Sequence, residues 1–137
     1  MKKVYILGPM RGKYLYNFPA FDAAEELLRD MGFDPLSPAR MERDEGFNPE
    51  DLIVYGSHSG VQLPWDWDSW NPEKVTHRFQ GNDIKYIAPT IKNFIQRDIS
   101  GVLDSDGVYA LKGWEDSTGA RAEMAVANWA GKFKIYE

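Results

Sequence analysis

The first third of the chain alternates between two hydrophobic patterns. Residues 3–7 form an almost continuous apolar run, as in a strand that is buried on both faces of a parallel sheet. After Asn17, apolar side chains recur every three to four residues and predict a helix, with Asn17 as its cap and Gly32 at its end. Residues 33–36 then predict a short second strand, because nearby prolines limit its hydrogen bonds.

The last third repeats this alternation. Residues 84–103 have helical spacing of apolar side chains, and Pro89 kinks or begins the main helix. Residues 106–111 predict a buried strand, a second helical pattern starts at Thr118, and residues 133–136 predict a last strand. The alternation of strands and helices predicts a three-layer, Rossmann-like (flavodoxin-like) α/β sandwich around a mainly parallel sheet of four or five strands.

Residues 39–82 follow neither pattern clearly. Within them, residues 63–72 carry three tryptophans in a span of six positions. The indole faces could stack on a nucleobase whose edge is read by Asp66 or Asp68, or they could form a satellite core or a subunit contact. We interpret residues 39–82 as an insertion or long loop within one domain that covers residues 1–137.

The composition narrows the class of protein. The 137 residues have a net charge of −5 with acids and bases interspersed, which argues against a nucleic-acid polymer as partner. There is no cysteine, and the spacing of His58 and His77 does not match a metal site. No apolar run approaches the roughly 20 residues of a membrane span, so we expect a cytoplasmic protein with a small-molecule substrate and no membrane partner.

One stretch near the C-terminus carries candidate chemistry. The strand at 106–111 leads through a polar turn into the helix that begins at Thr118, and ligands of open α/β sheets sit at this edge. Ser117 can cap that helix or, together with the free backbone amides, hold an anion. Glu123 lies within about two turns of the same helix end. A carboxylate beside an anion-binding helix end indicates chemistry on a phosphorylated small molecule.

Two further charged residues have a simple surface interpretation. Arg11, in the glycine-bounded loop after the first strand, could bind a carboxylate or phosphate in a bidentate manner, or form a surface salt bridge. Asp98 stands beside Arg97 and away from the apolar stripe of its helix, where an acid is typical of a solvated face.

Three motifs taken together resemble one known superfamily. They are Tyr5-Ile-Leu-Gly-Pro-Met-Arg11, Arg97-Asp98-Ile99 and Ser117-Thr-Gly-Ala-Arg-Ala-Glu123. In this order, and on these elements, they resemble the nucleoside 2-deoxyribosyltransferase superfamily. Within it the chain is most similar to the deoxynucleoside 5'-monophosphate N-hydrolases and their phage relatives. The resemblance covers residues 3–37 and 84–136.

The resemblance implies a role for each matching residue. Glu123 would be the nucleophile that attacks C1' of the sugar and forms a glycosyl-enzyme ester. Asp98 would help to protonate the departing base, and Tyr5 would position the nucleophilic carboxylate. Arg11 and Ser117 would hold the 5'-phosphate.

The remaining implications concern the loops and the assembly. Gly8 and Gly119 would allow close approach of the backbone to the substrate, whereas Pro9 replaces a hydroxyl residue of some hydrolases and puts one phosphate contact in doubt. No metal or organic cofactor would be required. Dimers of the family complete each active site with a residue from the neighbouring chain, so we expect a homodimer or higher homo-oligomer. Asn128 and the C-terminal strand lie in the corresponding region, and a phage-encoded member would act in the host cytoplasm.

The expected activity follows from these roles. It is cleavage of the N-glycosidic bond of a (deoxy)nucleoside 5'-monophosphate, which releases the free base and the sugar 5-phosphate. The alternative is a nucleoside 2-deoxyribosyltransferase that moves deoxyribose between bases, so that a second base rather than water captures the ester. A second alternative is a nucleotide-binding module without catalysis.

Overall fold

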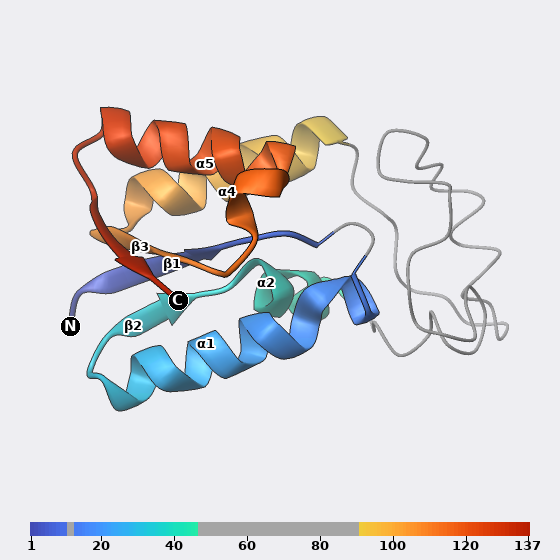
Figure 1. Cartoon of the computed structure of the whole chain (residues 1–137), viewed down its shortest axis with the longest axis horizontal. Coiled ribbons are helices and arrows are strands. Elements are labelled where there is room, and N and C mark those ends of the chain that lie inside the picture. Colours follow the sequence, from blue (N-terminus) through green and yellow to red (C-terminus); the bar gives the residue numbers. More distant parts are fainter. Residues whose placement is uncertain (11–12, 47–90) are drawn as a thin grey trace, which may run out of the picture.

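The fold is a three-layer α/β sandwich around a parallel sheet (Figure 1). The computed structural model describes residues 1–10, 13–46 and 91–137. Within them the sheet has four strands in the order β2-β1-β3-β4. Their bounds are β1 Lys3–Leu7, β2 Asp34–Leu36, β3 Gly107–Ala110 and β4 Phe133–Tyr136. All three pairings are parallel, which confirms the predicted Rossmann-like sandwich with a parallel sheet.

Helices cover both faces of the sheet. Helix α1 (Phe18–Asp30) lies on one face, and α4 (Ile91–Asp104) and α5 (Thr118–Trp129) lie on the other (Figure 1). Short 3-10 turns, η1 (Leu15–Asn17) and η4 (Trp114–Asp116), precede α1 and α5. The carboxyl ends of β1 and β3 therefore meet the N-terminal end of α5 at one edge of the sheet, where ligands of this fold class bind.

The central strand β1 explains how one polar group reaches the interior. Val4 and Ile6 pack in the cluster on the α1 side, whereas Tyr5 and Leu7 pack in the cluster on the α4 and α5 side. Successive side chains of a strand point to opposite faces, and here both faces are covered. The alternation therefore directs the Tyr5 hydroxyl toward α4 and α5.

The start of α1 differs from the prediction that Asn17 caps it. Asn17 has a left-handed backbone with φ of 62° and makes no capping hydrogen bond. A cap needs an extended backbone at this position, so the side chain turns elsewhere. Its amide Nδ2 donates to the carbonyl of Pro9 at 2.9 Å, which ties the loop after β1 to the start of the helix. The predicted end of α1 is confirmed, because Gly32 follows the helix with φ of +88°.

Helix α2 (Pro38–Asp44) lies within the stretch interpreted as an insertion or long loop, so that interpretation is wrong for residues 39–44. Pro38 occupies the first turn, where a proline loses no hydrogen bond, and Ala39 and Glu42 are buried. A helix this short shows too few turns for its periodicity to stand out. Residues 47–82, including the tryptophan segment at 63–72, and Pro89 lie outside the described residues.

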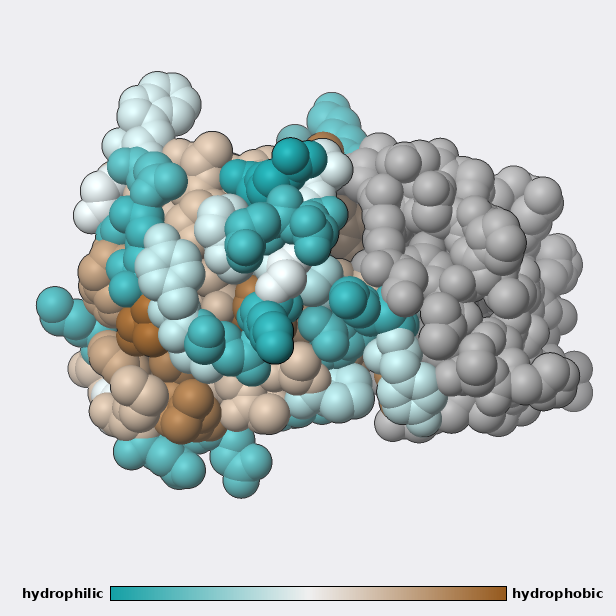
Figure 2. Space-filling view, in the orientation of Figure 1, coloured by the Kyte–Doolittle hydropathy of each residue, from teal (hydrophilic) through white to brown (hydrophobic). Residues whose placement is uncertain are grey.

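The described surface is mixed in character. Figure 2 shows hydrophilic and hydrophobic residues interspersed over one face, in agreement with the interspersed charges of the sequence. None of the helices in the described ranges has the length and apolar character that crossing a membrane requires.

Candidate active site

The centre of the candidate site is a buried pair formed by Tyr5 and Glu123. Glu123 lies on the inner side of α5 and is 9% exposed, while Tyr5 on β1 is fully buried. The Tyr5 hydroxyl donates a hydrogen bond to Oε2 of Glu123. A carboxyl group buried in this way needs a partner, and a tyrosine from the central strand supplies it. The structure thus brings together two residues that lie far apart in the chain.

Gly101 on α4 makes room for this pair. A Cβ atom at Gly101 would lie 2.9 Å from the Tyr5 ring, so only glycine lets α4 pack this closely on the tyrosine. No motif of the sequence singled out Gly101. The available signal was a glycine in the middle of a helical pattern, which usually has a packing or functional reason.

Exchanging Gly101 for alanine is therefore expected to destabilise the protein. Overpacking against the Tyr5 ring should lower the free energy of unfolding by about 1–3 kcal/mol, measured by urea unfolding. Gly119→Ala is the matched control, because a Cβ there meets nothing within 4 Å. That variant should be unchanged or more stable by up to about 1 kcal/mol. Equal unfolding free energies for the two variants would contradict the close packing of α4 on Tyr5.

A second carboxylate, Asp98, lies beside the pair. It projects from α4 with 23% of its side chain exposed, and the Nε of Arg97 donates to its Oδ1 at 2.9 Å. The solvated-face interpretation of Asp98 is therefore wrong, because most of the side chain is covered. Asp98 is also close enough to Glu123 that its charge raises the pKa of Glu123.

The carboxyl groups influence each other's protonation. Burial, followed by the charge of Asp98, raises the pKa of Glu123 from 4.5 to about 8, against the opposing effects of the Tyr5 hydroxyl and Arg97. Burial likewise raises the pKa of Asp98, with Arg97 opposing and Glu45 adding to the shift. Two ionised carboxylates in one covered site repel each other. The pair consequently retains a proton at neutral pH, the arrangement that acid–base catalysis by paired carboxyl groups requires.

One family model matches most of the chain. A family model described as a domain of unknown function, DUF4406, matches residues 2–56 and 86–136. The chain belongs to the DUF4406 family. No curated protein matches it. The matched ranges contain Tyr5, Asp98 and Glu123, and the resemblance to the deoxyribosyltransferases stays a prediction.

In this DUF4406 chain, Ser117 caps α5. Its Oγ accepts a hydrogen bond from the amide of Ala120 at 3.2 Å, which confirms the capping interpretation. The hydroxyl hydrogen is not used in that bond and can be donated to an anion at the helix end. Ser117 lies six positions before Glu123, or about 9 Å along the helix axis.

The other predicted binding residues have different outcomes. A Cβ atom at Gly8 would lie 2.6 Å from the Leu111 side chain, so Gly8 is required for packing of the loop against the end of β3. Gly119 borders open space, and Pro9 is buried with its carbonyl bonded to Asn17. Arg11 lies outside the described residues.

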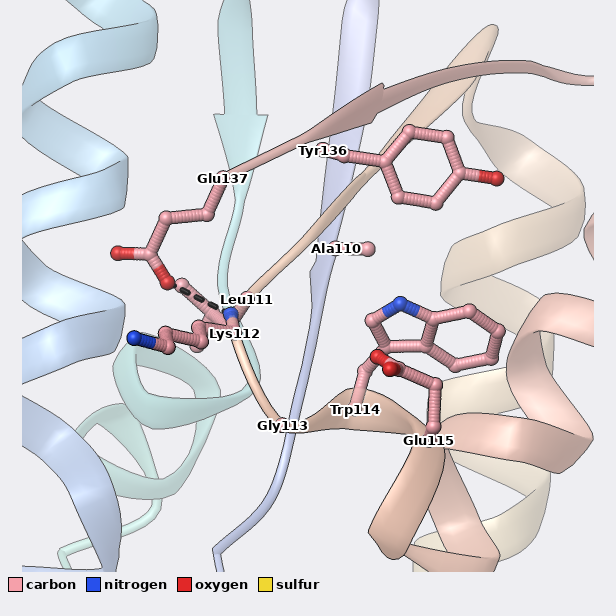
Figure 3. A pocket seen from close by; sticks show the side chains of 8 residues that line it. All are labelled: Ala110, Leu111, Lys112, Gly113, Trp114, Glu115, Tyr136 and Glu137. Carbon is pink, nitrogen blue, oxygen red and sulfur yellow. Dashed lines mark hydrogen bonds between the residues drawn. The ribbon is translucent and has the colours of Figure 1, made fainter.

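A hollow of about 430 Å³ is lined in part by the turn that leads from β3 to α5 (Figure 3). It lies at the carboxyl ends of β3 and β4, and Trp114 and Tyr136 form two of its walls with ring centroids 6.5 Å apart. Oε1 of Glu137 accepts a hydrogen bond from the amide of Lys112 at 2.6 Å, which joins the chain end to the β3 turn. The carboxyl pair does not line this hollow. Among the described residues, no group of three or more acidic, histidine or cysteine side chains could hold a metal ion.

Proposed function

We propose that this DUF4406 protein cleaves the N-glycosidic bond of a (deoxy)nucleoside 5'-monophosphate. The observation that carries the proposal is the convergence of Glu123, Tyr5 and Asp98 from three elements, the central strand β1 and the two helices α4 and α5 that cover one face of the sheet. Cleavage of this bond needs one carboxylate at the anomeric carbon and a second acidic group for the departing base. The site offers both, with one of them oriented by a buried tyrosine.

Glu123 and Asp98 can carry out the cleavage in two steps. Ionised Glu123 attacks C1' and forms an ester while the C1'–N bond breaks, and the proton held by the pair passes through Asp98 to the departing base. Asp98, now ionised, takes a proton from water, whose oxygen attacks C1' and releases Glu123 from the ester. The products are the free base and the sugar 5-phosphate, and the pair has regained its proton.

The Tyr5 hydroxyl has a defined task in this cycle. Burial and the charges of Glu123 and Asp98 raise the pKa of Tyr5 well above its ordinary value, so the hydroxyl stays a hydrogen-bond donor. Donation stabilises the ionised form of Glu123, which is the form that attacks. The Tyr5 hydroxyl therefore stabilises the ionised Glu123 carboxylate when the shared proton is transferred to the base.

The phosphate group of the substrate is proposed to bind at the start of α5. Exposed amides at a helix N-terminus and the Ser117 hydroxyl favour an anion there. The test is chromatography of each nucleoside and deoxynucleoside monophosphate after incubation with the protein, with and without an added acceptor base. Free base and sugar phosphate support the proposal, a new nucleotide identifies transfer, and unchanged nucleotides that nevertheless bind identify a module without catalysis.

A substitution at Ser117 separates phosphate binding from helix capping. Aspartate caps helices as well as serine does, but its charge repels phosphate. Ser117→Asp should raise the KM for a monophosphate by about tenfold or more, with little change for the unphosphorylated nucleoside and in Tm. Ser117→Ala, which loses the cap, should lower Tm as well. Equal effects of Ser117→Asp on nucleotide and nucleoside would place the phosphate elsewhere.

A further inference from the structure

The guanidinium of Arg97 lies among three carboxylates that come from two helices. Its Nη1 is 2.5 Å from Oε1 of Glu42 and 3.5 Å from Oε2 of Glu45, and its Nε is 2.9 Å from Oδ1 of Asp98. The guanidinium also lies over the Phe94 ring, 5.1 Å from its centroid. Arg97 thus connects the short helix α2 to Asp98 of the candidate site.

Glu42 is deeply buried for a charged residue. Its side chain is 4% exposed and that of Arg97 is 17% exposed, whereas that of Glu45 is 45% exposed. A buried ion pair often stabilises a fold no more than well-packed apolar side chains of similar volume would. Burial of Glu42 is therefore poorly explained by stability alone, and its contact with Arg97 points to a role in orientation.

The rigid guanidinium of Arg97 links the position of Glu42 to that of Asp98. It is a rigid plane whose donors have fixed directions. Glu42 is bound by Nη1, and Asp98 by Nε of the same plane. Once Glu42 and the Phe94 ring fix the plane, the direction of the Nε–H bond toward Asp98 is fixed too.

Resting on the function proposed above, we propose that Glu42 is a positioning residue, which fixes Arg97 so that Arg97 holds Asp98 in place to protonate the departing base. The three residues Glu42, Arg97 and Asp98 form what we call the clamp. The clamp acts through Asp98 alone, because Glu42 and Arg97 need not touch the substrate. Helix α2, which no motif of the sequence marks, then becomes part of the catalytic apparatus.

The clamp also sets the charge around Asp98. The groups that act on this carboxyl are Arg97 from its own helix, Glu123 from α5, Glu45 from the end of α2 and the Tyr5 hydroxyl from β1. Neutralising Glu42 leaves the positive charge of Arg97 less balanced. The ionised state of the carboxyl pair is then favoured, and the alkaline limb of kcat moves to lower pH.

The test is Glu42→Gln, compared with Glu45→Gln as the matched control. Misorientation of the acid should lower kcat about tenfold or more, with KM unchanged within about twofold and the alkaline limb of the pH profile at lower pH. Glu45→Gln should change kcat by no more than about twofold, because Glu45 is exposed, lies 3.5 Å from Nη1 of Arg97 and has its charge screened by solvent. Identical kcat values for the two variants, with matching circular dichroism and Tm, would overturn the clamp.

Arg97→Lys repeats the test without losing the charge, and it decides the matter if Glu42→Gln does not fold. A single ammonium group has no rigid plane that reaches both carboxylates, so kcat should again fall by about tenfold or more. Activity equal to that of the unmodified protein would mean that charge alone suffices and would overturn the positioning role.

A measurement without substrate separates this inference from the proposed activity. The carboxyl carbons of Asp98 and Glu123 can be titrated by NMR in protein labelled with carbon-13, assigned with Asp98→Asn and Glu123→Gln. Glu42→Gln should shift the titration of Asp98 to lower pH through Arg97, and Glu45→Gln should also lower it, because the charge of Glu45 raises the pKa of Asp98. If the unmodified protein releases no base, the proposed function fails, while an unshifted titration in Glu42→Gln refutes the clamp whatever the activity.

Discussion

Replacing Glu123 by glutamine is expected to abolish release of the base from nucleoside monophosphates. The amide cannot form the glycosyl ester, so kcat should fall by at least about a thousandfold, while binding of the nucleotide persists. Base release is measured by chromatography and binding by calorimetry. Glu26→Gln, an exposed change on α1 at the opposite face of the sheet, is the control and should retain full activity. Turnover by Glu123→Gln within tenfold of the control would remove Glu123 from the nucleophilic role.

The same variant should reveal the burial of the carboxyl group through the pH dependence of stability. Glu123 has a pKa raised from 4.5 to about 8 in the fold, so its protonated form is favoured there. The stability that this provides is complete below pH 4.5 and is lost as the pH rises toward about 8. Glutamine does not titrate, so Glu123→Gln should gain unfolding free energy relative to the unmodified protein across this range. Parallel stability curves would show that Glu123 is not buried as a carboxylic acid.

Trapping the intermediate gives a direct view of the nucleophile. A 2-fluoro-2-deoxy sugar phosphate with a good leaving group should slow release of the ester and leave a stable adduct. Mass spectrometry of peptides should locate the adduct on Glu123. An adduct on another residue would contradict the assignment even if Glu123→Gln were inactive.

The second large effect is expected from Asp98→Asn. The amide cannot deliver a proton to the base, so kcat should fall by roughly a hundredfold to a thousandfold with natural nucleotides. The loss should shrink when the leaving group needs no proton, as in a nitrophenyl deoxyriboside 5-phosphate. Glu123→Gln should stay inactive with that substrate, since the ester is still required. Equal losses for Asp98→Asn with both substrates would assign Asp98 to orientation rather than to proton delivery.

The elements that could be predicted are those whose pattern is local. The strand at Lys3–Leu7, the strand at Phe133–Tyr136 and the start of a helix at Thr118 after the Ser117 cap agree with the structure. Each depends on burial of both faces of a strand or on a hydrogen bond within one turn. The capping role of Asn17 was wrong because its left-handed backbone is set by the loop that it closes, not by the helix that follows.

The candidate site was predictable only in part. The residue types and their order led to Tyr5, Asp98 and Glu123, but Asp98 alone was indistinguishable from a solvated acid. Gly101, one turn further along the same helix, packs closely on Tyr5, and Asp98 faces the site beside it. Glu42 carried no signal, because its contact with Arg97 spans 55 positions of the chain.

By itself, the sequence determined the alternation of strands and helices, the parallel sheet and the helix end at Ser117, because periodicity and capping depend on neighbours within a few residues. Only the tertiary structure decided that Glu123 is buried against Tyr5 and that Asp98 is held by Arg97. These contacts join residues of different elements, and their directions depend on how closely the helices pack on the central strand.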